Sequence, residues 1–101
     1  MLFHVRMDVH LPDSMSNQEK EHLKTIEKEY SLTLQETGKW KYIWRIVGQY
    51  ANISIFEVND NEELHQILSN LPLFHYMDIQ VMPLCTHPSD LQKQENSSCM
   101  Q

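Results

Sequence analysis

Apolar and polar residues alternate at the start of the chain and again in its middle. Residues 2–10 alternate with the period of two that is typical of a half-buried strand, and Pro12 closes this segment. Residues 40–58 contain two further alternating segments that meet at Gly48 and Gln49. This pattern predicts two antiparallel strands joined by a tight turn.

Between these strands the apolar residues recur at helical spacing. Ser16 and Glu19 have the spacing of a capping box, and Gly38 is a typical helix stop, so we predict a helix from Ser16 to about Glu36. The apolar side of this helix consists of Leu23, Ile26, Tyr30 and Leu34.

A second helix and a fourth strand complete the pattern. The cluster 59–61 is a turn and N-cap signal, and a short helix follows it over about 62–70. Its inward side consists of Leu64, Ile67, Leu68 and Leu71. A last strand is predicted over about 76–82, with the chain turn-like from Pro83.

The predicted order is β-α-β-β-α-β, which is the split βαβ arrangement of ferredoxin-like α+β domains. Two helices would cover one face of a four-stranded antiparallel sheet. Simple alternation places Trp40, Trp44, Tyr50 and Phe56 on the uncovered face. Because this apolar area is too large to leave in water, we expect two sheets to pair in a dimeric α+β barrel.

Size and charge exclude several classes of function. The 101 residues predict one domain over 1–89, followed by a polar tail over 90–101. A net charge of -6 with scattered basic residues argues against nucleic acid as a partner, and we expect no association with membranes, because no apolar run is long enough to span one. Cys85 and Cys99 are expected to be free thiols in a reducing cytoplasm.

Neither a metal nor a nucleotide cofactor is expected. The chain has only two glycines, too few for a phosphate-binding loop, and its six histidines include no pair at i, i+4 on a helix. Any chemistry would then come from ordinary side chains.

Glu27 is the most informative of these side chains. It lies four residues after Leu23 and three before Tyr30, so it projects close to the apolar side of the first helix. Loss of water around a carboxylate raises its pKa and makes it a competent general base. A salt bridge to Arg45 is an equally good explanation from the residues alone.

Four further residues are candidates for binding a ligand. Arg45 could hold a carboxylate or an oxyanion, or it could be an edge residue with an exposed head group. Tyr50 and Asn52 could donate hydrogen bonds to a carbonyl, or they could be polar residues of a dimer interface. His4 could reach the same space or line solvent. The alternation leaves open which face of the sheet Arg45 occupies.

Several blocks of the sequence resemble the muconolactone delta-isomerase family. The resemblance runs from Met1 to about Ser89. It is carried by Met1-Leu2-Phe3-His4-Val5, Leu11-Pro12, Trp44-Arg45-Ile46-Val47-Gly48, Tyr50-Ala51-Asn52, Leu71-Pro72-Leu73-Phe74, Tyr76-Met77-Asp78-Ile79 and Leu84-Cys85-Thr86-His87-Pro88-Ser89.

This resemblance implies a ferredoxin-like protomer, a dimeric barrel and a homodecameric ring. It implies a cofactor-free isomerase that moves the C=C double bond of (+)-muconolactone to give the 3-oxoadipate enol-lactone, in the catechol branch of the 3-oxoadipate pathway. Glu27 then becomes the proton shuttle and Arg45 the clamp for a carboxylate or oxyanion. Tyr50 and Asn52 become donors, and His4 a further pocket residue.

The chain departs from the family pattern at four positions. Gln49 stands where the family has histidine and Ile53 where it has tyrosine, while His75 replaces a proline and Thr86 a basic residue. The first two departures motivate an alternative function, dehalogenation of a chloromuconolactone. A non-catalytic oligomeric binding module is the third hypothesis.

Overall fold

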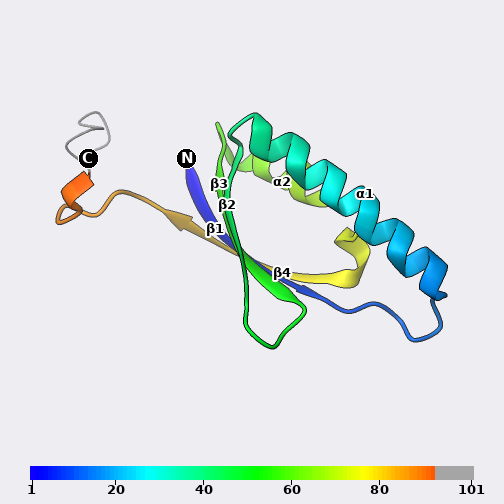
Figure 1. Ribbon diagram of the computed structural model, residues 1–101. Helices are drawn as coiled ribbons and strands as arrows, with labels where there is room; N and C mark the ends of the chain where they lie inside the picture. The colour runs from blue at the N-terminus through cyan, green and yellow to red at the C-terminus, as the bar shows by residue number, and fades with distance from the viewer. Residues whose placement is uncertain (93–101) are drawn as a thin grey trace.

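The structure is a computed structural model that describes residues 1–92, a four-stranded antiparallel sheet with two helices on one face (Figure 1). Along the chain lie β1 (Leu2–Val9), α1 (Asn17–Glu36), β2 (Trp40–Arg45), β3 (Ala51–Glu57), α2 (Asn61–Ser69), a short 3-10 helix (Phe74–Tyr76) and β4 (Met77–Leu84). The predicted β-α-β-β-α-β order is confirmed. Cys99 and most of the predicted tail lie outside the described residues.

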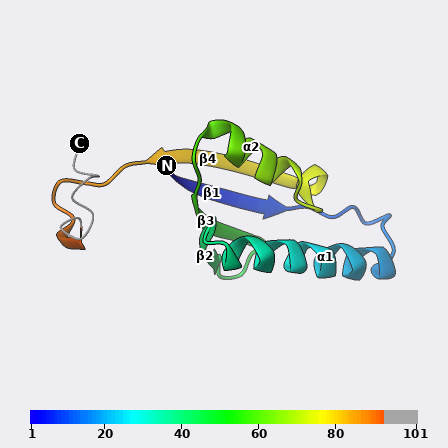
Figure 2. The ribbon, with the colours of Figure 1, turned by 90° about the horizontal axis from the view of Figure 1, so that it is seen from above.

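The strands are ordered β2-β3-β1-β4, so β1 and β3 are central and β2 and β4 form the edges. Figure 2 shows both helices on the same side of this sheet, with α1 beside β2 and β3, and α2 beside β1 and β4. The opposite face of the sheet is not covered by any described part of the chain.

Local signals fix both ends of α1. The Ser16 hydroxyl accepts a hydrogen bond from the backbone N–H of Glu19 at 3.1 Å, as the capping box predicts. At the other end Gly38 has a φ of +81°, and Gly38 and Lys39 donate backbone hydrogen bonds to Gln35 and Leu34. These are the bonds of a Schellman motif, in which glycine takes the left-handed position at little cost.

A β-bulge at Lys41 changes the side on which the aromatic residues lie. Trp40 pairs with Phe56, but Tyr42 pairs with Ile55, so one residue of β2 has no partner on β3. An extra residue reverses the alternation of side chains along a strand. Trp40 and Trp44 therefore lie on opposite faces of the sheet.

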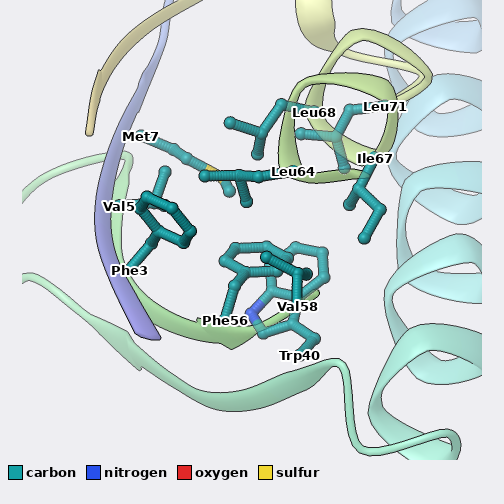
Figure 3. Packing of buried hydrophobic residues seen from close by; sticks show 10 residues of the cluster. All are labelled: Phe3, Val5, Met7, Trp40, Phe56, Val58, Leu64, Ile67, Leu68 and Leu71. Carbon is teal, nitrogen blue, oxygen red and sulfur yellow. The ribbon is translucent and has the colours of Figure 1, made fainter. Parts of the chain in front are cut away.

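The prediction for the uncovered face was wrong for three of its four residues. Trp40 is 2% exposed and Phe56 is fully buried, and both lie beneath the helices with their ring centroids 4.7 Å apart (Figure 3). Tyr50 lies on the helix-covered side of the hairpin. Only Trp44 faces outward, and Tyr42 stacks against it at a centroid distance of 5.3 Å.

The core lies between the sheet and the two helices. α2 contributes Leu64, Ile67 and Leu68, followed by Leu71, and this confirms the predicted inward side of that helix (Figure 3). On the sheet side the core is completed by the helix-facing residues of β1, which are Phe3, Val5 and Met7.

β4 is longer than the sequence predicted. It continues through Pro83, which stands opposite Phe3, and ends at Leu84. An edge strand tolerates proline because one of its two sides has no partner strand that needs its N–H.

The position of Trp40 gives a direct test of the bulge. Trp40→Ala should lower the free energy of unfolding by about 3–5 kcal/mol, because it removes a large side chain from a packed core. Lys41→Ala, at the exposed bulge itself, should change it by less than about 0.5 kcal/mol. Urea unfolding measures both values, and equally small effects would contradict this placement.

Candidate active site

A cleft of about 280 Å³ lies between α1 and the β2–β3 hairpin. This volume is at the small end for ligand pockets and suits a small organic molecule. It is lined by Lys24, Glu27, Lys28, Ser31, Trp40, Ile43, Arg45, Tyr50, Asn52, Leu73 and Met77. Four of the five site residues expected from the sequence therefore meet in one place.

Glu27 is held in the cleft by a backbone group from a distant part of the chain. The N–H of Leu73 donates to Glu27 Oε1 at 3.0 Å. Burial raises the pKa of Glu27 above its ordinary value, and the Leu73 hydrogen bond lowers it by a smaller amount. The result is a carboxyl group with a raised pKa in a cleft.

Arg45 does not form the salt bridge with Glu27 that the sequence left open. Within residues 1–92 Glu27 has no ion pair at all. The explanation of Glu27 as half of a structural ion pair is therefore not supported. A carboxylate without a neutralising partner keeps its basicity for a ligand.

Packing of the helices positions this carboxylate. Tyr30 lies one turn after Glu27 and donates its hydroxyl hydrogen to the carbonyl of Ile67 at 2.9 Å, which ties α1 to α2. The chain after α2 then turns through Leu73, which is 2% exposed, and brings its N–H to α1. One side of the cleft is thus fixed by both helices.

The register of the hairpin settles the face of Arg45. Arg45 stands directly opposite Asn52 in the β2–β3 pairing, and residues paired in this way project to the same face. Asn52 in turn stands opposite the buried Met7 on β1, so this face is the one that the helices cover. Arg45, Tyr50 and Asn52 all line the cleft.

Two cations in the cleft were not among the expected site residues. The ammonium of Lys24 lies 5.5 Å from the centroid of the Tyr50 ring, within reach of a cation–π interaction, and so reaches from α1 to the hairpin. Lys28 lines the same space. The available signal for Lys24 was its position three residues before Glu27, a spacing that makes two side chains neighbours on a helix surface. Lys28 follows Glu27 directly, and its position in the sequence gave no such signal.

His4 is not brought to this cleft. It stands opposite Ile55 and Met82 in the sheet, and its side chain projects to the uncovered face. The two departures that motivated the dehalogenase alternative, Gln49 and Ile53, do not line the cleft either. Ile53 shares the uncovered face, and Gln49 accepts a hydrogen bond at 3.1 Å from Arg6, which also belongs to that face.

Residues 1–92 were compared with the requirements of a metal site and of a membrane-spanning helix. Among residues 1–92 there is no group of three or more His, Cys, Asp or Glu side chains that could hold a metal ion. None of the described helices combines the length and the apolar character needed to cross a bilayer.

The sequence matches a family model described as muconolactone delta-isomerase over residues 1–90. The chain belongs to the muconolactone delta-isomerase family. It is 57% identical to muconolactone delta-isomerase 1 of Acinetobacter lwoffii, over 95% of this chain and all of that protein. It is also 57% identical to the Rhodococcus opacus muconolactone delta-isomerase, over 89% of this chain and 97% of that one.

Solved structures agree with this assignment. A crystal structure of muconolactone isomerase superposes with a TM-score of 0.87 at 51% identity, covering 91% of this chain and 96% of that chain. A 5-chloro-2-hydroxyhydroquinone dehydrochlorinase from Burkholderia phenoliruptrix has a TM-score of 0.67 at 17% identity, over 89% of this chain and 99% of that one. The second likeness shows that the fold is shared, and no more.

The raised pKa of Glu27 predicts how stability depends on pH. In this isomerase-family protein the folded state holds the Glu27 proton above the ordinary pKa of 4.5, at which the unfolded chain releases it. Glu27 therefore favours folding below that pH, and this contribution is lost as the pH rises through the raised pKa. Glu27→Gln abolishes the titration but keeps an oxygen that accepts from Leu73.

Urea unfolding from about pH 4 to about pH 8 measures this effect. The stability of Glu27→Gln relative to the wild type should increase with pH across the window. A difference that is constant, or that falls as the pH rises, would contradict a raised pKa.

Proposed function

We propose that this chain is a muconolactone delta-isomerase that works without a cofactor. It moves the C=C double bond of (+)-muconolactone to give the 3-oxoadipate enol-lactone, in the catechol branch of the 3-oxoadipate pathway. The observation that carries the proposal is Glu27: a half-buried carboxylate in a cleft, with a raised pKa and with no cation paired to it.

The reaction needs one proton to leave a carbon and return to another. The carbonyl of the unsaturated lactone activates the ring carbon that bears the side chain, and Glu27 removes its proton. The electron pair of the broken C–H bond enters the ring and forms a dienolate. Glu27 then returns the proton to the carbon next to the carbonyl, and the double bond has moved with no net gain or loss of atoms.

Because Leu73 binds one oxygen of Glu27, the two oxygens have different roles in the proposed mechanism. Oε1 accepts the backbone N–H, so Oε2 is the oxygen that carries the proton. Burial raises the basicity of the carboxylate, while the bond to Leu73 limits its rotation. A single base held in this way can serve both carbons on one face of a flat ring.

The remaining lining residues match the charges of the substrate. The dienolate oxygen needs hydrogen-bond donors, which Asn52 and Tyr50 supply. The side-chain carboxylate needs a cation, and Arg45 provides the bidentate partner, with Lys24 on the opposite side of the cleft. We place Arg45 with the substrate carboxylate because it lines the cleft from β2, whereas Glu27 lines it from α1.

No specific observation favours the dehalogenase alternative. Its motivation was that Gln49 and Ile53 would touch the substrate, and neither lines the cleft that contains Glu27. A non-catalytic module is also disfavoured, because it gives no reason to place an unpaired carboxylate in a cleft at the cost of its solvation.

We further propose that two sheets pair through their uncovered faces, within a decameric ring, in the cytoplasm. Tyr42 and Trp44 are each 54% exposed on this face, and Met82 and Leu84 extend the apolar surface across β4. An apolar surface of this kind is typical of an interface. Within residues 1–92 Cys85 is an exposed thiol without a disulfide, which suits a reducing compartment.

The role of Glu27 is tested by its isosteric variant. Glu27→Gln should reduce kcat for muconolactone by roughly 100- to 10,000-fold, because an amide cannot accept the proton. Glu29→Gln, two residues along the same helix and exposed, is the matched control and should keep full activity. The ultraviolet spectrum follows the reaction, and undiminished turnover by Glu27→Gln would reject the mechanism.

The proposed dimer is tested by placing a charge in the uncovered face. Trp44→Glu should give protomers of 12.0 kDa in light scattering, because the paired sheets would bury an unpaired carboxylate. Val47→Glu, in the exposed turn of the same hairpin, should retain the wild-type mass. A wild-type protein that is itself monomeric would refute the paired sheets.

A further inference from the structure

Ser54 is a polar residue in the apolar core directly beside the cleft. It lies on the helix-covered face of β3, opposite Val5 on β1 and Ile43 on β2, and its side chain is fully buried. A buried hydroxyl destabilises the fold unless it is hydrogen-bonded. Its one side-chain partner in the described chain is the cleft residue Asn52, whose Oδ1 lies 2.8 Å from Ser54 Oγ.

A second contact fixes the orientation of the Asn52 amide. Its Nδ2 lies 3.7 Å from Sδ of Met7, which is fully buried on the neighbouring strand. A thioether sulfur has no hydrogen to donate, so it can only accept. This contact is a hydrogen bond only with the nitrogen toward Met7, and that is the orientation of the amide in the structure. The oxygen then faces Ser54, whose hydroxyl must act as the donor.

The orientation of the Asn52 amide determines whether a ligand in the cleft meets a hydrogen-bond donor or an acceptor. An amide nitrogen carries two hydrogens, and Met7 takes one of them. The other has no protein acceptor within residues 1–92, and Asn52 lines the cleft. The oxygen, in contrast, is engaged by Ser54. Asn52 thus presents an N–H donor to the cleft rather than a carbonyl acceptor.

We propose that Ser54 is a positioning residue that holds Asn52 with its N–H toward the oxygen of the substrate's lactone carbonyl. This inference rests on the proposed isomerase function. Without the Ser54 hydroxyl, the Asn52 oxygen is left buried without a donor, and the amide gains by rotating toward water in the cleft. Rotation would turn an acceptor toward an oxygen that becomes negative during the reaction.

A double-mutant cycle separates this role from simple packing. Ser54→Ala should lower kcat by about 10- to 100-fold with little change in KM, because the misplaced donor matters most when the oxygen carries charge. In the Asn52→Ala background the same substitution should have no further effect. An equal loss in both backgrounds, or no loss in the first, would overturn the proposal.

Side-chain amide NMR provides a readout that does not depend on turnover. In protein labelled with 15N-asparagine, the Asn52 NH₂ signals are identified by their absence in Asn52→Ala. Ser54→Ala should shift these signals and speed their hydrogen exchange with water. Ser69→Ala removes a hydroxyl that bonds only within α2, and it should leave both the signals and kcat unchanged.

The two readouts distinguish the two proposals. A folded wild-type protein without isomerase activity would reject the proposed function, while the amide signals would still decide whether Ser54 holds Asn52. Unchanged Asn52 signals in Ser54→Ala would overturn the positioning role even if the wild type isomerises muconolactone. Circular dichroism confirms that each variant is folded before it is compared.

Discussion

The hydrogen bond from Leu73 N–H to Glu27 links the proposed catalytic group to the packing of the fold. The carboxylate comes from the middle of α1, and the N–H comes from the turn after α2, 46 residues later. The bond forms only when both helices are packed on the sheet. It also partly offsets the cost of burying a carboxylate, and it leaves one oxygen of Glu27 available to a substrate. The proposed catalytic geometry therefore depends on the docking of two helices rather than on a flexible loop.

Because of the bulge at Lys41, the aromatic residues of β2 lie on both faces of the sheet. Trp40 lies in the core, where it packs on Phe56 and also lines the cleft. Tyr42 and Trp44 lie on the uncovered face, where they form an exposed apolar surface. A regular strand would have placed Trp40 and Trp44 on the same face of the sheet. One extra residue thus supports both the active-site cleft and the proposed interface.

Periodicity and capping predicted the elements because both depend on residues that are close in the sequence. Ser16, Glu19 and Gly38 fixed the limits of α1, and the position of Glu27 beside the apolar side of that helix identified the central carboxylate. The bulge was not predictable, because Lys41 carries no residue-type signal such as glycine. The face of Arg45 depends on the hairpin register, which alternation alone does not determine. His4 was correctly placed on the polar side of β1, but that side faces away from the cleft.

The Leu73 contact escaped prediction for a different reason: it is made by a backbone group, whose position no side-chain pattern reports. The same holds for the orientation of Asn52, which results from two buried neighbours on different strands. Tertiary contacts of this kind give ordinary residues their special properties.

The central claim is that Glu27 is a carboxyl group whose pKa is raised by burial and which carries the proton between two carbons. A 13C NMR titration of the Glu27 side-chain carboxyl, assigned with Glu27→Gln, measures this pKa directly in the free protein. The account predicts a midpoint above 4.5, with kcat/KM rising over the same pH range as the base loses its proton. A midpoint at or below 4.5, or an activity that does not follow this titration, would contradict it.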